Sequence, residues 1–220
     1  MKRIRAAKRA LEARAKEEAA AAGQLSESAK PDSKAQYNFT DPESRIMKGP
    51  DGFVQAYNVQ VAVDELQLIV GQAVTQETND KKQLMPMITT IERQSGHTPS
   101  QLLADAGYCS DVNLAAIGDT TIDAYISTRK QKHGERPGPC PRGPLPKTAT
   151  IVDRMSRKLH AKAGAAVYAA RKGIVEPVIG QIKQARGFRQ FLLRGFEKVQ
   201  GEWSLMCTTH NILKLYRLCV

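Results

Sequence analysis

Two neighbouring strand-like runs, residues 53–63 and 66–74, constrain the fold of this chain most strongly. In the first run every second residue from Tyr57 to Val63 is apolar, which is the period of a strand with one buried face. A turn of two acidic residues joins the runs. Two strands around so short a turn predict an antiparallel β-hairpin.

The segments after the hairpin alternate between helical and strand-like patterns. The expected elements are a helix with Asp80 as N-cap and Gly96 as C-cap, a short apolar strand ending at Ala104, a helix near 111–117, a strand at 122–126, and helices near 151–170, 174–185 and 196–217. This order predicts an α/β fold with a mixed sheet flanked by helices.

The N-terminal part of the chain has a different composition. Residues 2–22 are rich in Ala, Arg, Lys and Glu, which are strong helix formers, and this predicts an exposed charged helix. Residues 23–52 are polar and contain Gly, Ser and Pro, so we expect a loop or linker there. We therefore assign residues 1–35 to an N-terminal helix and linker, and residues 36–220 to the main domain.

Positive charge is concentrated in one stretch of the sequence. Lys and Arg together number 33 against 22 Asp and Glu, a formal net charge of +11. Between Arg129 and Lys198, 17 basic residues stand against 4 acidic ones. Such segregation favours a surface that follows the phosphates of nucleic acid. The alternative is a solvated charged face without a partner.

Other sequence features point away from a membrane or a metal framework. No run of 18 apolar residues is present, and the N-terminus lacks the apolar stretch of a signal peptide, so a cytoplasmic protein without a membrane partner is expected. The four cysteines are far apart, and His133 with Cys140 makes an incomplete zinc ligand set. We expect Cys109 to be a buried thiol and His210 a structural helix residue.

Asp105 is the first candidate for chemistry. It follows a short apolar strand and precedes Ala106 and Gly107. A carboxylate at a strand end, with a glycine two residues later, can face a metal ion instead of the core. The alternative is an ordinary turn or capping aspartate.

Glu176 is the second candidate. Pro177 suits the first turn of a helix and Gly173 a boundary before it, so Glu176 is expected at a helix start. Lys183 then lies two turns later on the same face, and the pair could hold a metal ion and a phosphate. The alternative is a glutamate favoured only by the positive end of the helix dipole.

Several segments together resemble the DDE (Asp-Asp-Glu) domain of bacterial insertion-sequence transposases, which has a ribonuclease-H-like fold. The segments are residues 52–64, 104–108, 174–183, 186–195 and 209–215. They occur in the order of that family, and the resemblance extends from about Thr40 to Leu218. It implies an enzyme that binds the ends of its element, cuts there and joins those ends to target DNA.

The resemblance also implies roles for individual residues. Asp105 would be the second and Glu176 the third of three carboxylates that hold two Mg²⁺ (or Mn²⁺) ions, and one ion activates the attacking oxygen while the other stabilises the leaving oxygen. The basic residues expected to contact DNA are Arg171, Lys172, Lys183, Arg186, Arg189 and Arg194. The partners implied are DNA and, for assembly, a second copy or a full-length transposase.

The first acid of the family has no counterpart in the sequence. Only two strands precede the helix before Asp105, and they fit the second and third strands of the family. Asp64 lies in the turn between them, and Asp41 is followed by proline. We therefore expect a truncated domain that lacks the first strand and the first acid and has no strand-transfer activity alone.

Two other functions remain open at this point. The chain could bind nucleic acid without catalysis through residues 129–198, or it could inhibit a full-length transposase by sharing its DNA or its partner surface.

Overall fold

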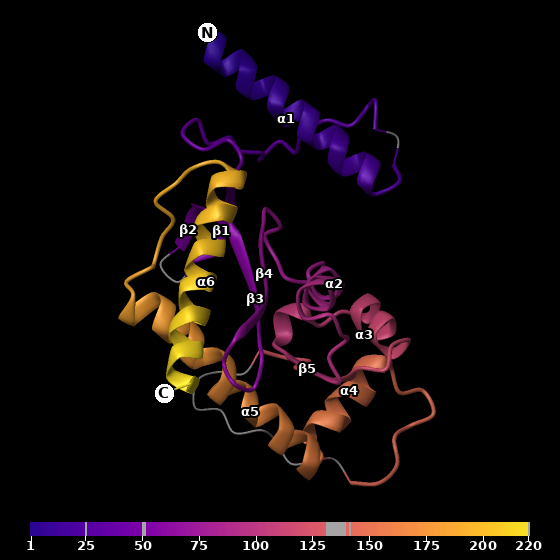
Figure 1. Ribbon diagram of the computed structural model, residues 1–220. Coiled ribbons are helices and arrows are strands. Elements are labelled where there is room, and N and C mark those ends of the chain that lie inside the picture. Colours follow the sequence, from indigo (N-terminus) through magenta and orange to yellow (C-terminus); the bar gives the residue numbers. More distant parts are fainter. Residues whose placement is uncertain (25, 50–51, 131–139, 141, 220) are drawn as a thin grey trace. The chain divides into compact units, whose positions relative to one another are not determined.

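The chain divides into two compact units, Met1–Tyr57 and Asn58–Val220. The computed structural model, shown in Figure 1, describes residues 1–24, 26–49, 52–130, 140 and 142–219. Within these ranges no helix combines the length and the apolar character that crossing a membrane requires.

The first unit consists of one long helix and a small hairpin. The elements are α1 (Lys2–Ala21), β1 (Arg45–Gly49) and β2 (Gly52–Ala56). β1 and β2 pair antiparallel. The expectation of a loop throughout 23–52 is therefore wrong for β1, whose sequence shows no strand alternation and which becomes a strand by pairing with β2. The helix expected at 2–22 is confirmed.

The second unit begins with the predicted hairpin. Its strands are β3 (Asn58–Val63) and β4 (Ile69–Thr75), which pair antiparallel with Val61 opposite Gln72. The single strand expected over 53–63 is wrong, since it breaks at Tyr57. Residues before Tyr57 pair with β1 and those after it with β4. The alternation of apolar residues continues through Tyr57, so the sequence pattern does not reveal that the strand changes its partner from β1 to β4 there.

The outer edge of β4 is closed by a side chain from the last helix, α6 (Phe196–Cys219). The Asn211 amide accepts a hydrogen bond from the backbone N–H of Ile69 at 2.8 Å and donates one to the carbonyl oxygen of Ile69 at 2.8 Å. A single side chain thus supplies both bonds that a neighbouring strand would make there.

A second pair of strands lies between helices. In chain order the elements are α2 (Leu84–Ser95), β5 (Gln101–Ala104), the 3₁₀ turn η1 (Ala106–Tyr108), α3 (Asp111–Gly118) and β6 (Asp123–Ile126). β5 and β6 are parallel, with Ala104 opposite Ile126. Their shared core consists of Leu84, Ile88, Ala104, Leu114, Ile117, Ile122, Ala124 and Ile126. Burial of each large apolar side chain there contributes roughly 1.5–3 kcal/mol.

Helices complete the second unit. They are α4 (Ile151–His160), α5 (Lys162–Gly180), the π-helical turn η2 (Gln181–Ala185) and α6. The single helix expected over 151–170 is wrong, because the chain turns at Ala161. At this corner a Cβ on Gly164 would stand 1.9 Å from the carbonyl oxygen of Lys158, so only glycine allows the close approach.

The arrangement confirms the predicted fold class, a mixture of helices and strands consistent with a ribonuclease-H-like domain, and among the described residues the strands form three separate pairs instead of one mixed sheet. β3 is antiparallel to β4, whereas β5 is parallel to β6. Among the described residues, β3 and β5 each pair with one strand only. α5 packs against β3, β5 and β6 and so covers both pairs of strands.

Candidate functional site

Asp105 lies at the carboxyl end of β5, directly after Ala104. The neighbouring strand β6 runs parallel and ends at the same level, with Ile126 opposite Ala104. The carboxyl ends of parallel strands form the edge at which α/β folds bind their ligands. Asp105 is exposed there, as its sequence context predicted.

The turn after Asp105 explains why a glycine follows two residues later. Asp105 is the N-cap of η1, and its Oδ1 accepts a hydrogen bond from the Gly107 N–H at 2.7 Å. A Cβ on Gly107 would stand 3.0 Å from Asp105 Oδ1 and 2.7 Å from Asp80 Oδ2. Asp105 Oδ1 and Asp80 Oδ2 therefore lie no farther apart than the sum of these two distances, and both oxygens border the position of Gly107.

Asp80 is a residue whose importance the sequence did not reveal. It was expected to cap a helix, but α2 begins at Leu84 with Gln83 as its N-cap. The Asp80 Oδ1 atom instead accepts hydrogen bonds from Asn58 Nδ2 at 2.8 Å and from Gln60 Nε2 at 2.7 Å. Both donors come from β3, and they hold the Asp80 carboxylate beside Asp105.

One signal in the sequence could have located this network. Asn58 and Gln60 share one face of an otherwise apolar strand, and Gln60 is only 2% exposed. A buried polar side chain requires hydrogen-bond partners, so its position predicts a polar network nearby. The partners themselves, Asp80 and Tyr108, are distant in sequence and leave no local pattern.

Two further side chains join the loops that carry Asp80 and Asp105. The Tyr108 hydroxyl donates a hydrogen bond to Gln60 Oε1. Asn113, which is buried, donates from Nδ2 to the carbonyl oxygens of Lys81 and Tyr108, each at 2.7 Å. These bonds tie both loops to β3 and α3.

Electrostatics keep the Tyr108 hydroxyl protonated. Burial raises the pKa of Tyr108 well above its ordinary value, and the negative charges of Asp80 and Asp105 raise it further. The hydroxyl therefore stays a hydrogen-bond donor to Gln60 across the neutral range.

Glu176 lies inside α5 and not at its start. The expected boundary at Gly173 is wrong, since the helix runs without a break from Lys162 to Gly180. Pro177 has no N–H to donate to the Gly173 carbonyl oxygen, and that oxygen accepts a hydrogen bond from Gln67 Nε2 at 3.0 Å instead. A partner from the turn between β3 and β4 thus lets the helix continue through proline. Glu176 is exposed on this helix.

The described side chains make an incomplete metal site. Carboxylates are the ligands that Mg²⁺ prefers, and the adjacent Asp80 and Asp105 fit that preference in kind. Among the described residues, however, no group of three or more His, Cys, Asp or Glu side chains is placed to hold a metal ion. The set of three carboxylates that the resemblance implies is not assembled here, so no reaction step is derived through an ion.

The predicted DNA-contacting residues lie on α5, on η2 and in the segment between η2 and α6. Lys172 on α5 and Lys183 on η2 are exposed. Arg171 on α5 is half-buried, with its guanidinium carbon 5.7 Å from the centre of the Tyr168 ring. Arg189, after η2, is exposed and donates to the Lys183 carbonyl oxygen at 3.4 Å.

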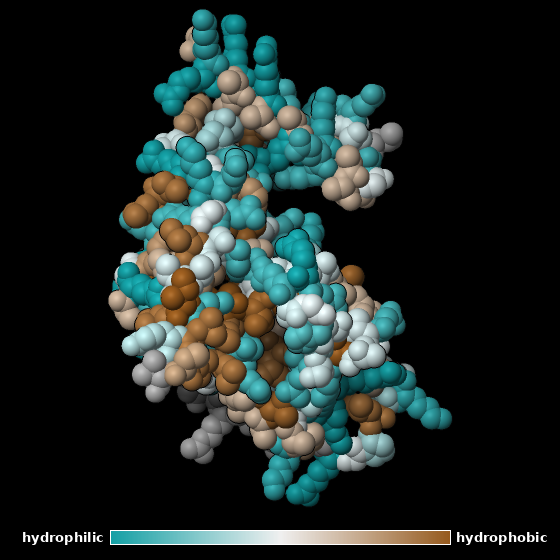
Figure 2. Space-filling view, in the orientation of Figure 1, coloured by the Kyte–Doolittle hydropathy of each residue, from teal (hydrophilic) through white to brown (hydrophobic). Residues whose placement is uncertain are grey.

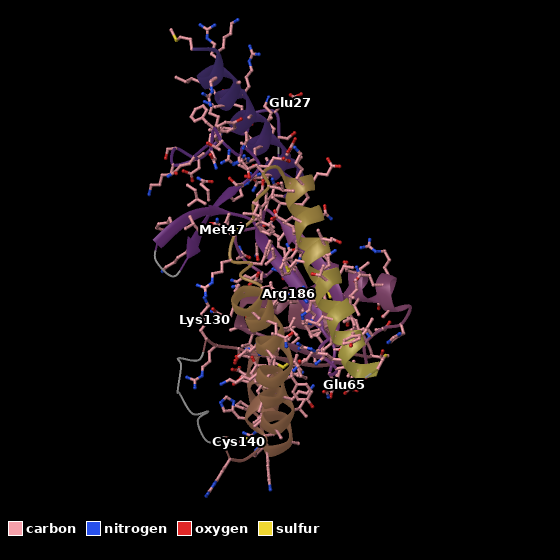
Figure 3. The ribbon with its side chains drawn as sticks, turned by 60° about the vertical axis from the view of Figure 1, so that its left-hand side comes forward. Glu27, Met47, Glu65, Lys130, Cys140 and Arg186 are labelled. Carbon is pink, nitrogen blue, oxygen red and sulfur yellow. The ribbon has the colours of Figure 1, made fainter. Side chains whose placement is uncertain are left out.

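The remaining two, Arg186 and Arg194, differ in what they contact. Arg186 donates to Thr209 Oγ1 at 2.6 Å and to the Thr209 carbonyl oxygen at 2.9 Å, which ties the end of η2 to α6 (Figure 3). Arg194 is exposed just before α6. Arg186 therefore already has a packing role, whereas Arg194 presents its charge to solvent.

The histidine and cysteine candidates have structural surroundings. His210 is 1% exposed, and its Nε2 lies 3.0 Å from the carbonyl oxygen of Gln67, as expected for a structural residue. Cys109 is half-buried with a free thiol whose pKa is raised by burial. Cys140 is half-buried, and His133 lies outside the described residues.

The comparison with protein families decides the family. Residues 27–212 match the family described as Transposase DDE domain. The chain belongs to this transposase family. Comparison with curated proteins and with solved structures finds no match. The match assigns the chain to proteins of DNA transposition, which transfer polynucleotides with divalent metal ions and have DNA as their partner. It spans both Asp105 and Glu176, and it confirms the resemblance found in the sequence.

Proposed function

We propose that this DDE domain belongs to an enzyme that cuts DNA at the ends of an insertion element and joins those ends to target DNA. The observation that carries the proposal is the placement of Asp105. Asp105 is exposed at the carboxyl end of a parallel strand. It lies beside the Asp80 carboxylate, which hydrogen bonds from Asn58 and Gln60 hold in place. In this proposal residues 36–220 form the catalytic domain, and Asp105 and Glu176 are the second and third acids.

The divalent ions, Mg²⁺ or Mn²⁺, would be held by Asp105 and Glu176 and would supply charge stabilisation at the phosphate under attack. The protein's own contribution is to fix the Asp105 carboxylate through its bond from the Gly107 N–H and to keep the loop rigid through Gln60 and Asn113. Rigid carboxylates do not need to reorganise when charge develops during the reaction.

The basic residues around η2 supply the DNA-binding surface of this proposal. Lys172, Lys183, Arg189 and Arg194 are exposed, and their charges favour phosphate contacts. Arg171 and Arg186 contribute from half-buried positions, where they also order α5 and α6.

We further propose that these 220 residues alone bind DNA without completing strand transfer. Two observations support this. In the described part of the chain, β3 and β5 each have one strand neighbour, and no group of three acidic side chains is placed to hold a metal. A full-length transposase would then supply what is missing, in the cytoplasm of a bacterium, whereas a second copy of this chain would add only DNA-binding surface.

The test uses the purified chain, duplex DNA carrying the ends of the element that encodes it, and Mg²⁺ or Mn²⁺. We expect binding that weakens steeply as salt rises, without cleavage. Metal-dependent cleavage that disappears in Asp105→Ala would contradict the proposed inactivity and would confirm the enzymatic role. Absence of DNA binding at low salt would contradict the whole proposal.

A second function is favoured by the same incomplete site. A domain that binds element ends without cutting them would compete with an active transposase. Adding the chain to such a transposase should then reduce excision in proportion to its concentration. Equal excision with and without the chain would exclude the inhibitory function.

A further inference from the structure

The segment between η2 and α6, Gly187–Gly195, is an irregular stretch bounded by two glycines in the left-handed region. Gly187 has φ of +68° and Gly195 φ of +87°. Side chains at either position would strain the backbone, so the two glycines allow the chain to leave η2 and enter α6 at sharp angles. We call this segment the 187–195 loop.

Aromatic packing anchors the start of the loop. The Phe188 ring stacks on Trp203 of α6, with centroids 6.3 Å apart, and meets Phe191 edge to face at 5.5 Å. Trp203 itself is buried, at 3% exposure. The loop is therefore fixed on the core of the second unit at its base.

A carboxylate holds the tip of the loop. Glu202 Oε1 accepts a hydrogen bond from the Leu192 N–H at 2.9 Å, and Glu202 Oε2 accepts one from the Leu193 N–H at 3.0 Å. Bonds from backbone N–H groups to a charged carboxylate are stronger than neutral ones. They set the direction in which both leucine side chains leave the backbone.

The leucines that this anchoring holds face solvent. Leu192 is 77% exposed and Leu193 is 48% exposed. Figure 2 shows apolar surface on the face that carries α6. An ordered loop that presents two adjacent leucines to water is suited to burying them in a partner.

The charge around the leucines identifies the chemistry of that partner. Between Lys183 and Lys198 there are five basic residues and one acidic residue. Arg189 and Arg194 are exposed and flank Leu192 and Leu193 in the sequence. An apolar tip between cations matches a polyanion with an apolar interior, and duplex DNA has phosphates outside and stacked bases inside.

We propose that the 187–195 loop is a wedge that enters a distorted step of the DNA duplex. Leu192 is inserted between neighbouring base pairs, Leu193 contacts the sugar edge, and Arg189 and Arg194 bind the flanking phosphates. Proteins that kink DNA use apolar side chains in this way. The inference rests on the proposed function only in taking DNA as the partner, and it adds that the loop opens the duplex.

The experiment compares two duplexes of one sequence, one fully paired and one with a single mismatch, each carrying 2-aminopurine beside the variable step. A mismatched step is easier to open, so a wedge prefers it. We expect the wild-type chain to bind the mismatched duplex about tenfold more tightly and to raise the 2-aminopurine fluorescence.

Leu192→Ser is the decisive variant, and Leu205→Ser is its matched control. Leu205 is 65% exposed on α6, outside the loop. Leu192→Ser should lose the mismatch preference and the fluorescence rise while keeping its affinity for the paired duplex, Leu192→Met should keep both, and Leu205→Ser should behave as wild type. Both serine replacements affect exposed side chains, so thermal unfolding should be unchanged.

Three results would overturn the wedge without contradicting the proposed function. One is an unchanged mismatch preference in Leu192→Ser. Another is DNA binding by the wild type without any preference, which removes the wedge and leaves the proposed function intact. The third is Leu192-dependent binding to anionic vesicles of phosphatidylglycerol with no effect of Leu192 on DNA, which would make the loop a membrane contact. Failure of the wild type to bind any DNA would refute the wedge and the proposed function together.

Discussion

The loop that carries Asp105 and the helix that carries Glu176 are built in different ways. Asp105 follows a strand on an apolar core, and buried amides from β3 and α3 hold the loops around it. Glu176 is exposed on α5, a helix that packs against β3, β5 and β6 and whose Gly173 carbonyl oxygen is bonded by the distant Gln67 side chain. The chain thus places these two carboxylates with different rigidity.

This difference teaches where mutations should act on stability and where they should not. Around Asp105 the buried amides of Gln60 and Asn113 each bond groups on more than one loop, so losing one of these side chains leaves several partners unpaired. Around Glu176 the side chain reaches solvent, and its removal leaves nothing unpaired inside the protein. Three substitutions test the comparison.

The largest effect is expected for Asn113→Leu. This change removes the donor to the carbonyl oxygens of Lys81 and Tyr108, and a carbonyl left without its partner costs up to about 1–3 kcal/mol where water does not replace the donor. We expect the free energy of unfolding in urea to fall by about 3 kcal/mol. Val112→Ala, a change of an exposed neighbour in α3, is the control and should have almost no effect. A loss below about 1 kcal/mol for Asn113→Leu would show that the loops are held by other means.

An intermediate effect is expected for Gln67→Asn, which shortens the side chain that bonds the Gly173 carbonyl oxygen. Asparagine tolerates the positive φ of 63° at this position, so the change tests the side-chain bonds, to the Gly173 carbonyl oxygen and from Lys214 Nζ, and not the backbone. We expect a loss of about 1 kcal/mol in the free energy of unfolding. In a Pro177→Ala background the helix supplies its own donor, and the loss should shrink. Equal losses in both backgrounds would contradict the compensation for Pro177.

The smallest effect is expected for Glu176→Gln. The side chain is exposed, so the free energy of unfolding should change by no more than about 0.5 kcal/mol. Chemical denaturation of the wild type and the variant checks this. A larger loss would mean that Glu176 is held as firmly as Asp105 and would remove the contrast between the two regions.

The sequence predicted those parts of the fold that depend on local pattern. The hairpin, the short strand before Asp105 and the helix cap at Gly96 follow from apolar period and turn chemistry, and all three are present. The exposed position of Asp105 followed in the same way, since an apolar run that ends in Asp-x-Gly places the carboxylate at a strand end.

The parts that were missed depend on partners far along the chain. Asp80 meets Asn58 and Gln60, which precede it by about twenty residues, and no local pattern links them. The helix through Pro177 depends on Gln67, which is 106 residues away from Gly173. Gly173 and Pro177 predict a helix boundary when only neighbouring residues are considered. The prediction fails because Gln67, in the turn between β3 and β4, supplies the hydrogen-bond donor that Pro177 lacks.

The bond pair between Asn211 and Ile69 has a consequence for assembly. A strand edge with unpaired backbone groups can pair with another strand, from the same protein or from a different one. With both backbone groups of Ile69 already engaged, the start of β4 offers no such template. Growth of this sheet is therefore blocked at that end of β4. Hydrogen exchange tests this. The Ile69 amide should be protected in the wild type and should lose that protection in Asn211→Ala, which would show that Asn211 prevents unwanted strand pairing.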